Sequence, residues 1–474
     1  MSENFPSSEK KELAIVETNI PGLLVVHLPV HGDSRGWFKE NWQREKMVNL
    51  GLPDFNPVQN NISYNNNKGA TRGIHTEPWD KYVSIGAGKA FCAWVDMREG
   101  HEPNVFTIEM DASTAVFVPR GVGNSYQALE DGTVYTYLVN EHWRPDGQYL
   151  ALNLADETAA IDWPIALDQA EISDKDKVNP SLAEAGKVPP KKVLITGGNG
   201  QLGLELQKLF PSAQAVDLNE FNISDSVAYD SINWNEYDTI INAAAYTNVD
   251  GAETPEGRII SWKANATALK YMAKVAIEHN LTLVHVSSDY VFDGTKVPHT
   301  ESEQFSPLSV YGESKAAGDI AVGIAPKHYI ARTSWVVGKG NNFVKTMKSL
   351  ADKGVKPSVV NDQFGRLTFA EDLANGIKHL VQTKQPYGTY NITNTGKVVS
   401  WADIAKLVYE QTDHSPEDVT GASTKEYYAG KENIAPRPLQ SEMDLSKIES
   451  TGFTPRDWKT VFDLYINELK SGEN

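Results

Sequence analysis

The stretch that decides the fold of the C-terminal half is Val193-Leu194-Ile195-Thr196-Gly197-Gly198-Asn199-Gly200-Gln201-Leu202-Gly203. A short apolar run leads into a G-x-x-G-x-x-G spacing, and the residues from Leu202 to Phe210 have helical spacing. Glycines permit a tight turn and let backbone N–H groups approach a pyrophosphate, which the positive N-terminus of the helix attracts. The stretch therefore predicts a strand, a turn and a helix that bind a dinucleotide cofactor.

The alternation of strand and helix continues beyond this stretch. Further apolar strand runs, Asp238–Asn242 and Leu281–Val286, are separated by a segment of helix length. Such alternation predicts a Rossmann-type, doubly wound parallel sheet covered by helices on both faces. The second strand ends in Ala215-Val216-Asp217, which puts a carboxylate where a cofactor ribose hydroxyl needs an acceptor. Asp217 favours NADH, but NADPH stays open.

A second motif supplies reducing chemistry. Tyr311 and Lys315 stand at i and i+4, so they share one helix face. An ammonium beside a phenol is expected to lower the pKa of the phenol and to make it a proton donor for carbonyl reduction. Ser288 ends a buried strand run, at the edge of the sheet where ligands bind in open α/β folds. The three residues predict a Ser-Tyr-Lys reductase site.

The N-terminal half has a different sequence pattern. Between Pro21 and about Pro164, short β-branched and aromatic runs alternate with Gly and Asn, which predicts an antiparallel sandwich or barrel. The charged, proline-containing stretch at 166–190 is interpreted as a linker, whose first part can still belong to the first domain. We expect two domains, residues 1–188 and residues 189–474.

Composition excludes several classes of protein. The 474 residues include 44 basic and 62 acidic side chains, and the net charge of −18 argues against a nucleic-acid partner. A single cysteine excludes intramolecular disulfides and cysteine-cluster metal sites. No run approaches the length of a membrane span, and the polar residues 1–12 do not have the pattern of a signal peptide. We expect a cytoplasmic enzyme with no membrane partner.

Longer motifs give the C-terminal half a family resemblance over about residues 192–470. They are Asn242-Ala243-Ala244-Ala245-Tyr246, Ser288-Asp289-Tyr290-Val291-Phe292, Arg332-Thr333-Ser334-Trp335, Gly340-Asn341-Asn342-Phe343, Asn361-Asp362-Gln363-Phe364-Gly365 and Arg437-Pro438 with Ser441 and Asp444. The segment resembles the extended short-chain dehydrogenase/reductases and, within them, the dTDP-4-dehydrorhamnose reductases. The resemblance implies a small C-terminal substrate subdomain and an NADPH or NADH cofactor.

The resemblance also assigns residues. Cofactor contacts are implied for Gly200, Gln201, Leu202, Asn242, Ala243, Ala244, Tyr311 and Lys315, in addition to Gly197, Gly203 and Asp217, which the turn and the second strand indicate by themselves. Substrate contacts are implied for Asp289, Tyr290, Trp335 and Arg437. Two departures are visible: Ser288 replaces a usual Thr and keeps the hydroxyl, and Leu367 replaces a usual Pro. Some relatives hold a metal through glutamates, and Glu205 fits one such position, but we predict no metal site.

Three segments of the N-terminal half carry polar groups on otherwise apolar strands. They are Asp33-Ser34-Arg35-Gly36, Gln59-Asn60-Asn61-Ile62-Ser63, and Arg72-Gly73-Ile74-His75 followed by Lys81. Because side chains alternate along a strand, His75 lies beside Arg72 only if that strand bulges or the pocket wraps around it. Residues on separate strands, such as Arg35, Lys81 and Tyr137, can converge only inside a barrel.

With Glu40, Val95-Asp96-Met97-Arg98, Pro119-Arg120-Gly121 and Ile172-Ser173-Asp174-Lys175-Asp176, these segments resemble the dTDP-4-dehydrorhamnose 3,5-epimerases over about residues 20–180. The resemblance implies a cupin-like jelly roll. It implies that His75 is the base at C3 and C5, that Asp176 orients it, that Tyr137 returns the proton, and that Lys81 stabilises the enolate. Substrate contacts are implied for Arg35, Glu40, Gln59, Asn61, Arg72 and Asn124.

Departures are more numerous in this half: Asn124 stands where a His is usual, Leu138 where Lys is common, and Ile62 where a His is found. We predict a bifunctional enzyme that converts dTDP-4-dehydro-6-deoxy-D-glucose to dTDP-L-rhamnose and forms a homodimer. One alternative keeps the chemistry on a UDP sugar. Another is a monofunctional 4-ketoreductase with a non-catalytic binding or dimerisation cupin. A regulatory sugar-nucleotide sensor is the third.

Overall fold

The computed structural model describes residues 12–145, 147 and 149–471, and its contacts divide the chain into two compact units between Pro190 and Lys191. Residues 1–11, which carry most of the expectation about a signal peptide, lie outside the described residues. Across the described ranges, none of the helices is long and apolar enough to cross a membrane. Each unit is described by itself.

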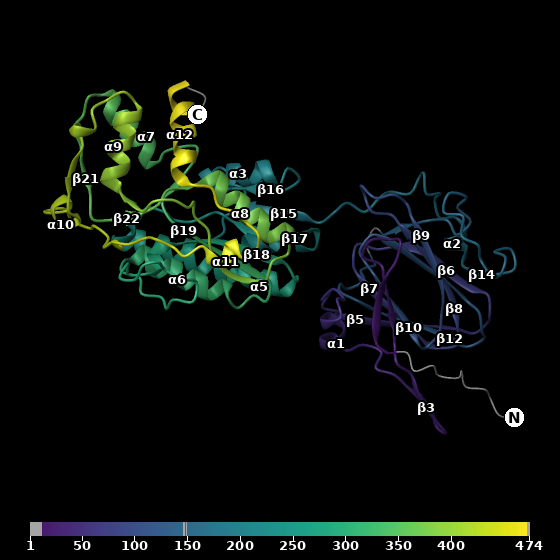
Figure 1. Cartoon of the computed structure of the whole chain (residues 1–474). Helices are drawn as coiled ribbons and strands as arrows, with labels where there is room; N and C mark the ends of the chain where they lie inside the picture. Colours follow the sequence, from purple (N-terminus) through teal and green to yellow (C-terminus); the bar gives the residue numbers. More distant parts are fainter. Residues whose placement is uncertain (1–11, 146, 148, 472–474) are drawn as a thin grey trace. The chain divides into compact units, whose positions relative to one another are not determined.

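The first unit consists of two β-sheets (Figure 1). One sheet has the order β1-β2-β10-β7-β12-β5, and its strands are β1 (Ala14–Glu17), β2 (Leu24–His27), β10 (Thr114–Val118), β7 (Lys81–Ala87), β12 (Thr133–Val139) and β5 (Gln59–Asn65). The other has the order β13-β6-β11-β8-β9, with β14 beside β6, and comprises β13 (Leu150–Ala151), β6 (Ala70–Thr76), β11 (Val122–Ala128), β8 (Ala90–Asp96), β9 (Val105–Met110) and β14 (Glu171–Ile172). All these pairs are antiparallel except β14 with β6. The predicted antiparallel β domain is confirmed.

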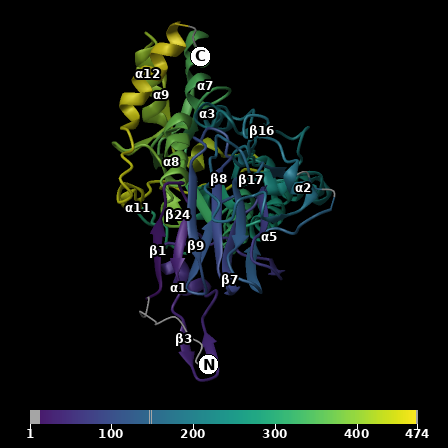
Figure 2. The same cartoon turned by 90° about the vertical axis from the view of Figure 1, so that its right-hand side faces the viewer.

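The core of this unit lies between the sheets. Val83, Val116 and Tyr135 from the first sheet pack with Trp94 and Tyr126 from the second, all of them buried. Outside the two sheets lie a hairpin of β3 (His31–Asp33) and β4 (Gly36–Phe38) and the helices α1 (Arg44–Asn49) and α2 (Asp174–Lys177). Figures 1 and 2 both show β3 extending away from the two sheets.

The interpretation of residues 166–190 as a linker is wrong for most of its length. Glu171–Ile172 forms β14, and the helix α2 (Asp174–Lys177) begins after Ser173, whose side chain accepts from the N–H of Asp176. Further on, the N–H of Val188 donates to Met97 O at 2.9 Å. The charged composition of the segment gave no sign of this packing, because Asp176 is buried against His75, a residue far away in the sequence.

The second unit is built on a parallel sheet in the order β16-β15-β17-β18-β19-β24. Its strands are β16 (Gln214–Val216), β15 (Lys192–Thr196), β17 (Tyr237–Asn242), β18 (Thr282–Ser288), β19 (His328–Thr333) and β24 (Gly388–Asn391). The predicted strands and the parallel sheet are therefore confirmed, and the predicted first helix is α3 (Gln201–Leu209).

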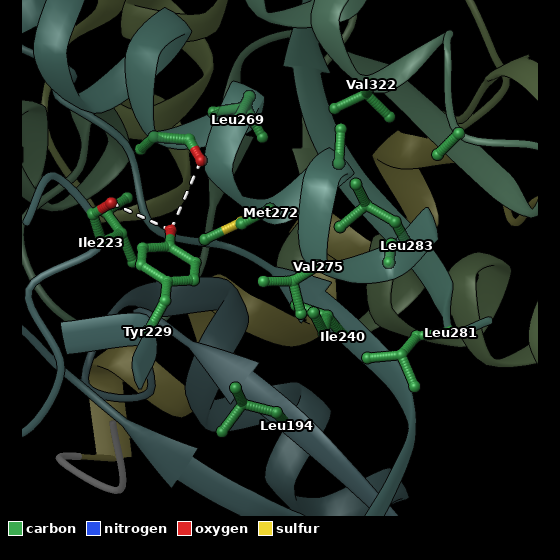
Figure 3. Close-up of a cluster of buried hydrophobic side chains, with 14 of the residues drawn as sticks. Leu194, Ile223, Tyr229, Ile240, Leu269, Met272, Val275, Leu281, Leu283 and Val322 are labelled. Carbon is green, nitrogen blue, oxygen red and sulfur yellow. Dashed lines mark hydrogen bonds between the residues drawn. The ribbon is translucent and has the colours of Figure 1, made fainter. Parts of the chain in front are cut away.

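Adjacent residues of each strand point their side chains to opposite faces of this sheet. Ile241 and its equivalents on neighbouring strands pack with α3 and α8 (Ala370–Gln382), and Ile240 and its equivalents pack with α5 (Ala268–Glu278) and α6 (Val310–Val322). Figure 3 shows the second cluster, where the Tyr229 hydroxyl donates to Ile223 O at 2.9 Å and to Ala268 O at 3.4 Å. Runs of consecutive apolar residues are needed because both faces are covered.

A separate apolar cluster joins α7 (Phe343–Asp352), α9 (Trp401–Gln411) and α12 (Trp458–Ser471). Short strand pairs connect this region to the sheet: β20 (Val336–Val337) with β23 (Thr368–Phe369), β21 (Ser358–Val360) with β26 (Thr420–Ala422), and β22 (Phe364–Gly365) with β25 (Val399–Ser400). The remaining helices are α4 (Pro255–Trp262), α10 (Thr424–Tyr427) and α11 (Ser446–Glu449).

Candidate active sites

The reductase candidates meet at the carboxyl end of β18. Ser288 is its last residue, and its hydroxyl donates to Asp289 Oδ1 at 2.8 Å. The start of α6 packs closely on the turn that follows, because a Cβ on Gly312 would lie 2.3 Å from Tyr290 O. The Tyr290 and Tyr311 rings therefore meet edge to face, 5.5 Å apart, and Tyr311 shares a hydrogen bond with Ser288.

Lys315 lies one turn further along α6, beneath the end of β18. Its Nζ donates to Val286 O at 2.7 Å and lies 3.3 Å from His285 Nε2. Burial lowers the pKa of Lys315 to about 8, with the charge of Asp319 acting in the opposite direction. Burial raises the pKa of Tyr311, and Asp289 adds to the rise. In the chain by itself the pKa of Tyr311 is therefore raised, and not lowered toward the working pH as the sequence suggested.

The glycine turn has the form expected for a cofactor-binding turn. Gly197 has φ +73°, and a Cβ there would lie 2.7 Å from Ala244 N, so the turn packs against Ala243 and Ala244. Gly203 is equally constrained, since a Cβ there would lie 2.1 Å from Gly197 O. These close contacts leave the backbone as the surface of the turn.

Other predicted cofactor residues surround this turn. Gly200 caps the N-terminus of α3 without a side chain, Leu202 is buried, and the buried Gln201 Oε1 has no hydrogen-bond partner in the described chain. Asp217 follows β16, and its carboxylate accepts from Asn199 N at 2.9 Å and from Leu218 N at 2.8 Å. The residues present therefore fit a dinucleotide, and the hydrogen bond from Asn199 N to Asp217 stabilises the turn.

Asn242 connects the turn to the lysine. Its Oδ1 accepts from Thr196 Oγ1 at 2.6 Å, and its Nδ2 lies 3.1 Å from His285 Nδ1. The second nitrogen of that imidazole faces Lys315. Asn242 thus points into the protein, beneath the carboxyl edge of the sheet.

The predicted substrate residues fall into two groups. Arg437 donates to both oxygens of Asp250 at 2.8 Å and is close enough to Tyr290 for their charges to interact. Tyr290 therefore lies with Arg437, and Asp289, the residue before it, accepts from Ser288. Trp335 instead stacks on Trp401 of α9 at 3.8 Å.

Glu205 and Glu371 line one cavity of the second unit. Glu205 accepts from Lys208 at 2.5 Å, and Glu371 across the same cavity accepts from Arg456 at 2.7 Å. Within 12–145, 147 and 149–471, no group of three His, Cys, Asp or Glu side chains could hold a metal ion. Each of the two carboxylates is paired with a cation of the chain.

The β unit builds its candidate site around a β-bulge. His75 pairs with Asn124 of β11 and Arg72 pairs with Tyr126, so three steps along β6 match two along β11. A Cβ on Gly73, within the bulge, would lie 2.5 Å from Ser125 Cβ. The bulge puts Arg72 and His75 on the same side of the strand, which was the condition set by the sequence.

His75 and Asp176 form a dyad. His75 Nε2 lies 2.8 Å from Asp176 Oδ1, and the two side chains are 41% and 6% exposed. Burial acts to raise the pKa of Asp176, but the hydrogen bond and charge of His75 outweigh it and hold that pKa below its usual value. The other ring nitrogen of the half-exposed imidazole is available for proton transfer.

Lys81 and Tyr137 lie on neighbouring strands of the facing sheet. Lys81 Nζ lies 5.9 Å from the centre of the Tyr137 ring and forms a buried ion pair with Glu77. Burial raises the pKa of Tyr137, and the charge of Glu77 adds to it. Glu77 was missed by the sequence reasoning, because it lies in the connection between β6 and β7, where spacing along the chain does not indicate a pair.

Aromatic stacking completes the wall of this site. Tyr135 donates to Asn124 Oδ1 at 2.9 Å, and its ring stacks on Tyr126 at 4.0 Å. The Tyr126 hydroxyl donates to Asn65 Oδ1, which also accepts from Arg72 Nε at 3.3 Å. Asn124 therefore accepts a hydrogen bond where the family usually has an imidazole.

The remaining predicted contacts lie at the edge of this unit. Gln59 donates to Asn61 at 2.9 Å on β5, and Asn61 pairs with Tyr137 across the strands. Arg35 stands in the β3–β4 hairpin, 87% exposed, and pairs with Asp33, while Glu40 pairs with Lys46. The structure does not bring Arg35 and Glu40 to His75 within one chain.

The two sites belong to different classes of protein: a β unit with a histidine–carboxylate dyad, and an α/β unit with a nucleotide-binding turn and a Ser-Tyr-Lys set. Residues 17–184 match the family model described as dTDP-4-dehydrorhamnose 3,5-epimerase, and residues 191–471 match the one described as RmlD substrate binding domain. The chain belongs to both families, one over each unit. Both resemblances inferred from the sequence are confirmed.

Individual relatives agree with this assignment. The chain is 46% identical over 180 residues to the "Protein RmlC homolog" of Streptococcus pyogenes serotype M6, which covers 36% of this chain and 90% of that protein. It is 37% identical over 289 residues to the dTDP-4-dehydrorhamnose reductase of Aggregatibacter actinomycetemcomitans, covering 56% and 96%. A crystal structure of dTDP-4-dehydrorhamnose reductase from Bacillus anthracis with NADP has a TM-score of 0.53 at 33% identity, covering 59% and 98%.

Proposed function

We propose that the chain is a bifunctional enzyme that forms dTDP-L-rhamnose from dTDP-4-dehydro-6-deoxy-D-glucose. The first unit, a cupin-like jelly roll over residues 1–188, inverts C3 and C5. The second, a Rossmann-type domain with a small substrate subdomain over residues 189–474, reduces the C4 ketone with NADPH or NADH. The observation that carries the proposal is that each family match on this one chain contains its own set of proton-transfer groups.

In the first reaction, His75 removes the protons at C3 and C5, whose acidity comes from the neighbouring C4 ketone. Asp176 fixes the orientation of the imidazole. Tyr137 returns the proton from the opposite face, and Lys81 stabilises the negative charge on the C4 oxygen. Arg35, Glu40, Gln59, Asn61, Arg72 and Asn124 bind the substrate.

In the second reaction, Tyr311 donates a proton to the C4 oxygen, to which Ser288 donates a hydrogen bond. The reduced nicotinamide supplies the hydride when it is bound. Lys315 stabilises the phenolate left on Tyr311. Asp289, Tyr290, Trp335 and Arg437 bind the sugar nucleotide, and the glycine turn binds the cofactor pyrophosphate. Epimerisation comes first, because reduction removes the ketone that makes C3–H and C5–H acidic.

We further propose that the enzyme is a homodimer that acts in the cytoplasm, where soluble reduced nicotinamide is formed. The hairpin supports a second copy: besides Arg35 it exposes Trp37 and Phe38, which are 41% and 66% exposed. Large apolar side chains gathered on a projecting hairpin are typical of an interface. Sedimentation analysis of the purified chain tests this.

A monofunctional reductase with a non-catalytic first unit is the second candidate, because Glu77 already neutralises Lys81 and Asn124 cannot titrate. One assay separates the candidates. The full chain is incubated with NADPH and either dTDP- or UDP-4-dehydro-6-deoxy-D-glucose, and the products are identified by mass spectrometry and chromatography against rhamnose standards. Our proposal predicts dTDP-L-rhamnose, whereas a product with unchanged C3 and C5 supports the monofunctional candidate. No NADPH oxidation with either sugar contradicts the proposal and supports a sensor.

A further inference from the structure

The face of α6 that carries the reductase residues continues one turn beyond Lys315. Tyr311, Lys315 and Asp319 stand at i, i+4 and i+8, so they share one face of the helix. All three are buried, with exposures of 9%, 2% and 2%. A buried carboxylate is costly unless it is paired, so Asp319 requires a physical reason.

Asp319 is anchored by an ion pair with β19. Its Oδ2 accepts from Arg332 Nε at 3.0 Å, and its Oδ1 lies 3.8 Å from His285 Nε2. The Arg332 guanidinium is fixed in turn between the rings of Phe292 and Phe305, at 5.2 Å and 5.1 Å from their centres. The carboxylate is therefore positioned by β19 as well as by its own helix.

Lys315 precedes Asp319 by one helical turn, and both side chains face the same imidazole nitrogen, His285 Nε2, with Nζ at 3.3 Å and Oδ1 at 3.8 Å. The two hydrogen-bonding contacts of Lys315, Val286 O and His285 Nε2, carry no negative charge, and burial lowers the pKa of its ammonium to about 8. The negative charge of Asp319 opposes that shift. Burial raises the pKa of Asp319 in turn, while the charges of Arg332 and Lys315 act to lower it. The charged and titratable groups around the pair are His285 from β18, Arg332 from β19, Tyr311 from α6, and Asp289, whose charge acts on Tyr311.

We propose that Asp319 is a positioning residue of the reductase site, the buried counter-ion that keeps the Lys315 side chain charged beneath Tyr311. The inference rests on the proposed reductase function. When Tyr311 gives its proton to the substrate, a phenolate is left in a buried site, and a charged Lys315 stabilises it. Asp319 touches neither substrate nor cofactor, and its effect passes through the lysine.

The chain offers a matched control for this aspartate. Asp372 of α8 is also buried, at 6% exposure, and accepts from Arg456 Nε at 2.5 Å. Asp319→Asn and Asp372→Asn therefore each remove a buried carboxylate that accepts from an arginine Nε in the same unit, with Arg332 4% and Arg456 43% exposed. Only the first removes a carboxylate beside Lys315.

The pH profile of NADPH-dependent reduction tests the inference. We expect wild-type activity to fall as pH rises through about 8, where Lys315 loses its proton. A neighbouring opposite charge shifts a pKa by roughly one unit or more. The alkaline limb of Asp319→Asn is therefore expected about one pH unit lower than that of the wild type, so that its reductase activity at pH 8 is about fivefold lower. The alkaline limb of Asp372→Asn is expected at the same pH as that of the wild type. If both variants have the same limb, the inference is wrong.

Arg332→Gln gives a test of opposite sign if Asp319→Asn does not fold. It removes the cation that competes with Lys315 for the carboxylate, so the alkaline limb is expected to move to higher pH. An unmoved or lowered limb contradicts the inference. Because Arg332 lies outside the cofactor turn, cofactor affinity measured by NADPH fluorescence at pH 7 should stay within about twofold.

A second readout does not depend on catalysis. The folded-state pKa of Lys315 lies below its ordinary value of 10.5, so the folded state gains stability as pH rises from about 8 toward 10.5. The gain is measured as a rise in the thermal-unfolding midpoint of the cofactor-free chain. In Asp319→Asn the rise should begin at lower pH than in Asp372→Asn. If the wild type oxidises no NADPH, the proposed function fails, and this readout still decides the role of Asp319. Coincident unfolding profiles contradict it.

Discussion

The two candidate sites place their proton-transfer groups in opposite surroundings. His75 is half-exposed and depends on Asp176, which comes from a helix about a hundred residues further along the chain. Tyr311 and Lys315 are buried on one helix and lie within a single turn of each other. The difference fits the chemistry. An epimerase base works with a second acid on the opposite face of the sugar, whereas the proton donor of a reductase acts beside a cofactor that excludes water.

The comparison predicts that the sites fail independently, and the largest effect is expected at Tyr311. Tyr311→Phe keeps the ring packing against Tyr290 but removes the proton donor. Reduction should fall by about 10²–10⁴-fold, measured as NADPH oxidation with epimerised substrate. Deuterium exchange at C3 and C5 should remain at the wild-type rate. Loss of both activities would mean that the sites are coupled.

A smaller loss is expected at the orienting carboxylate of the other unit. Asp176→Asn keeps the shape of the side chain but no longer fixes the imidazole of His75 as a carboxylate does. Exchange of C3 and C5 protons with solvent deuterium should fall by about 10–100-fold, as when the hydrogen-bonding partner of a metal-bound histidine is removed. Reduction of epimerised substrate is the internal control and should not change.

Cofactor binding separates the units in another way. A Cβ at Gly203 would lie 2.1 Å from Gly197 O, so Gly203→Ala must displace the glycine turn. Because overpacking of this kind costs about 1–3 kcal/mol, NADPH affinity should fall by roughly 10-fold or more. Fluorescence titration measures it, and Gly354→Ala, at an open surface turn, is the control. Unchanged affinity contradicts the assignment of the turn.

The smallest effect concerns stability in acid. The folded-state pKa of Asp176 is below its usual value, so its ionised form stabilises the first unit above the unfolded pKa, and this contribution is lost as pH falls through the folded value. The difference in unfolding midpoint between wild type and Asp176→Asn should shrink as pH falls from 6 toward 3. A difference that grows on acidification contradicts the pairing with His75.

Sequence predicted the reductase site better than the β-unit site because of where the residues lie. The glycine turn and the Tyr311–Lys315 pair are set by local spacing, and the parallel sheet follows from apolar runs. The meeting of His75 with Asp176 depends on a bulge and on a polar segment that was interpreted as a linker. Composition carries no signal for such long-range pairing, and the same limit hid the contact of Arg437 with Asp250.

Counting deuterium in the final product tests the account most directly. The full chain is given dTDP-4-dehydro-6-deoxy-D-glucose and NADPH in D₂O, and the product is returned to H₂O before mass spectrometry. Two complete sites in one chain predict dTDP-L-rhamnose with two carbon-bound deuterons, at C3 and C5, and protium at C4. Product without deuterium at C3 and C5, matching a His75→Ala control, would contradict the claim that the first unit is an epimerase.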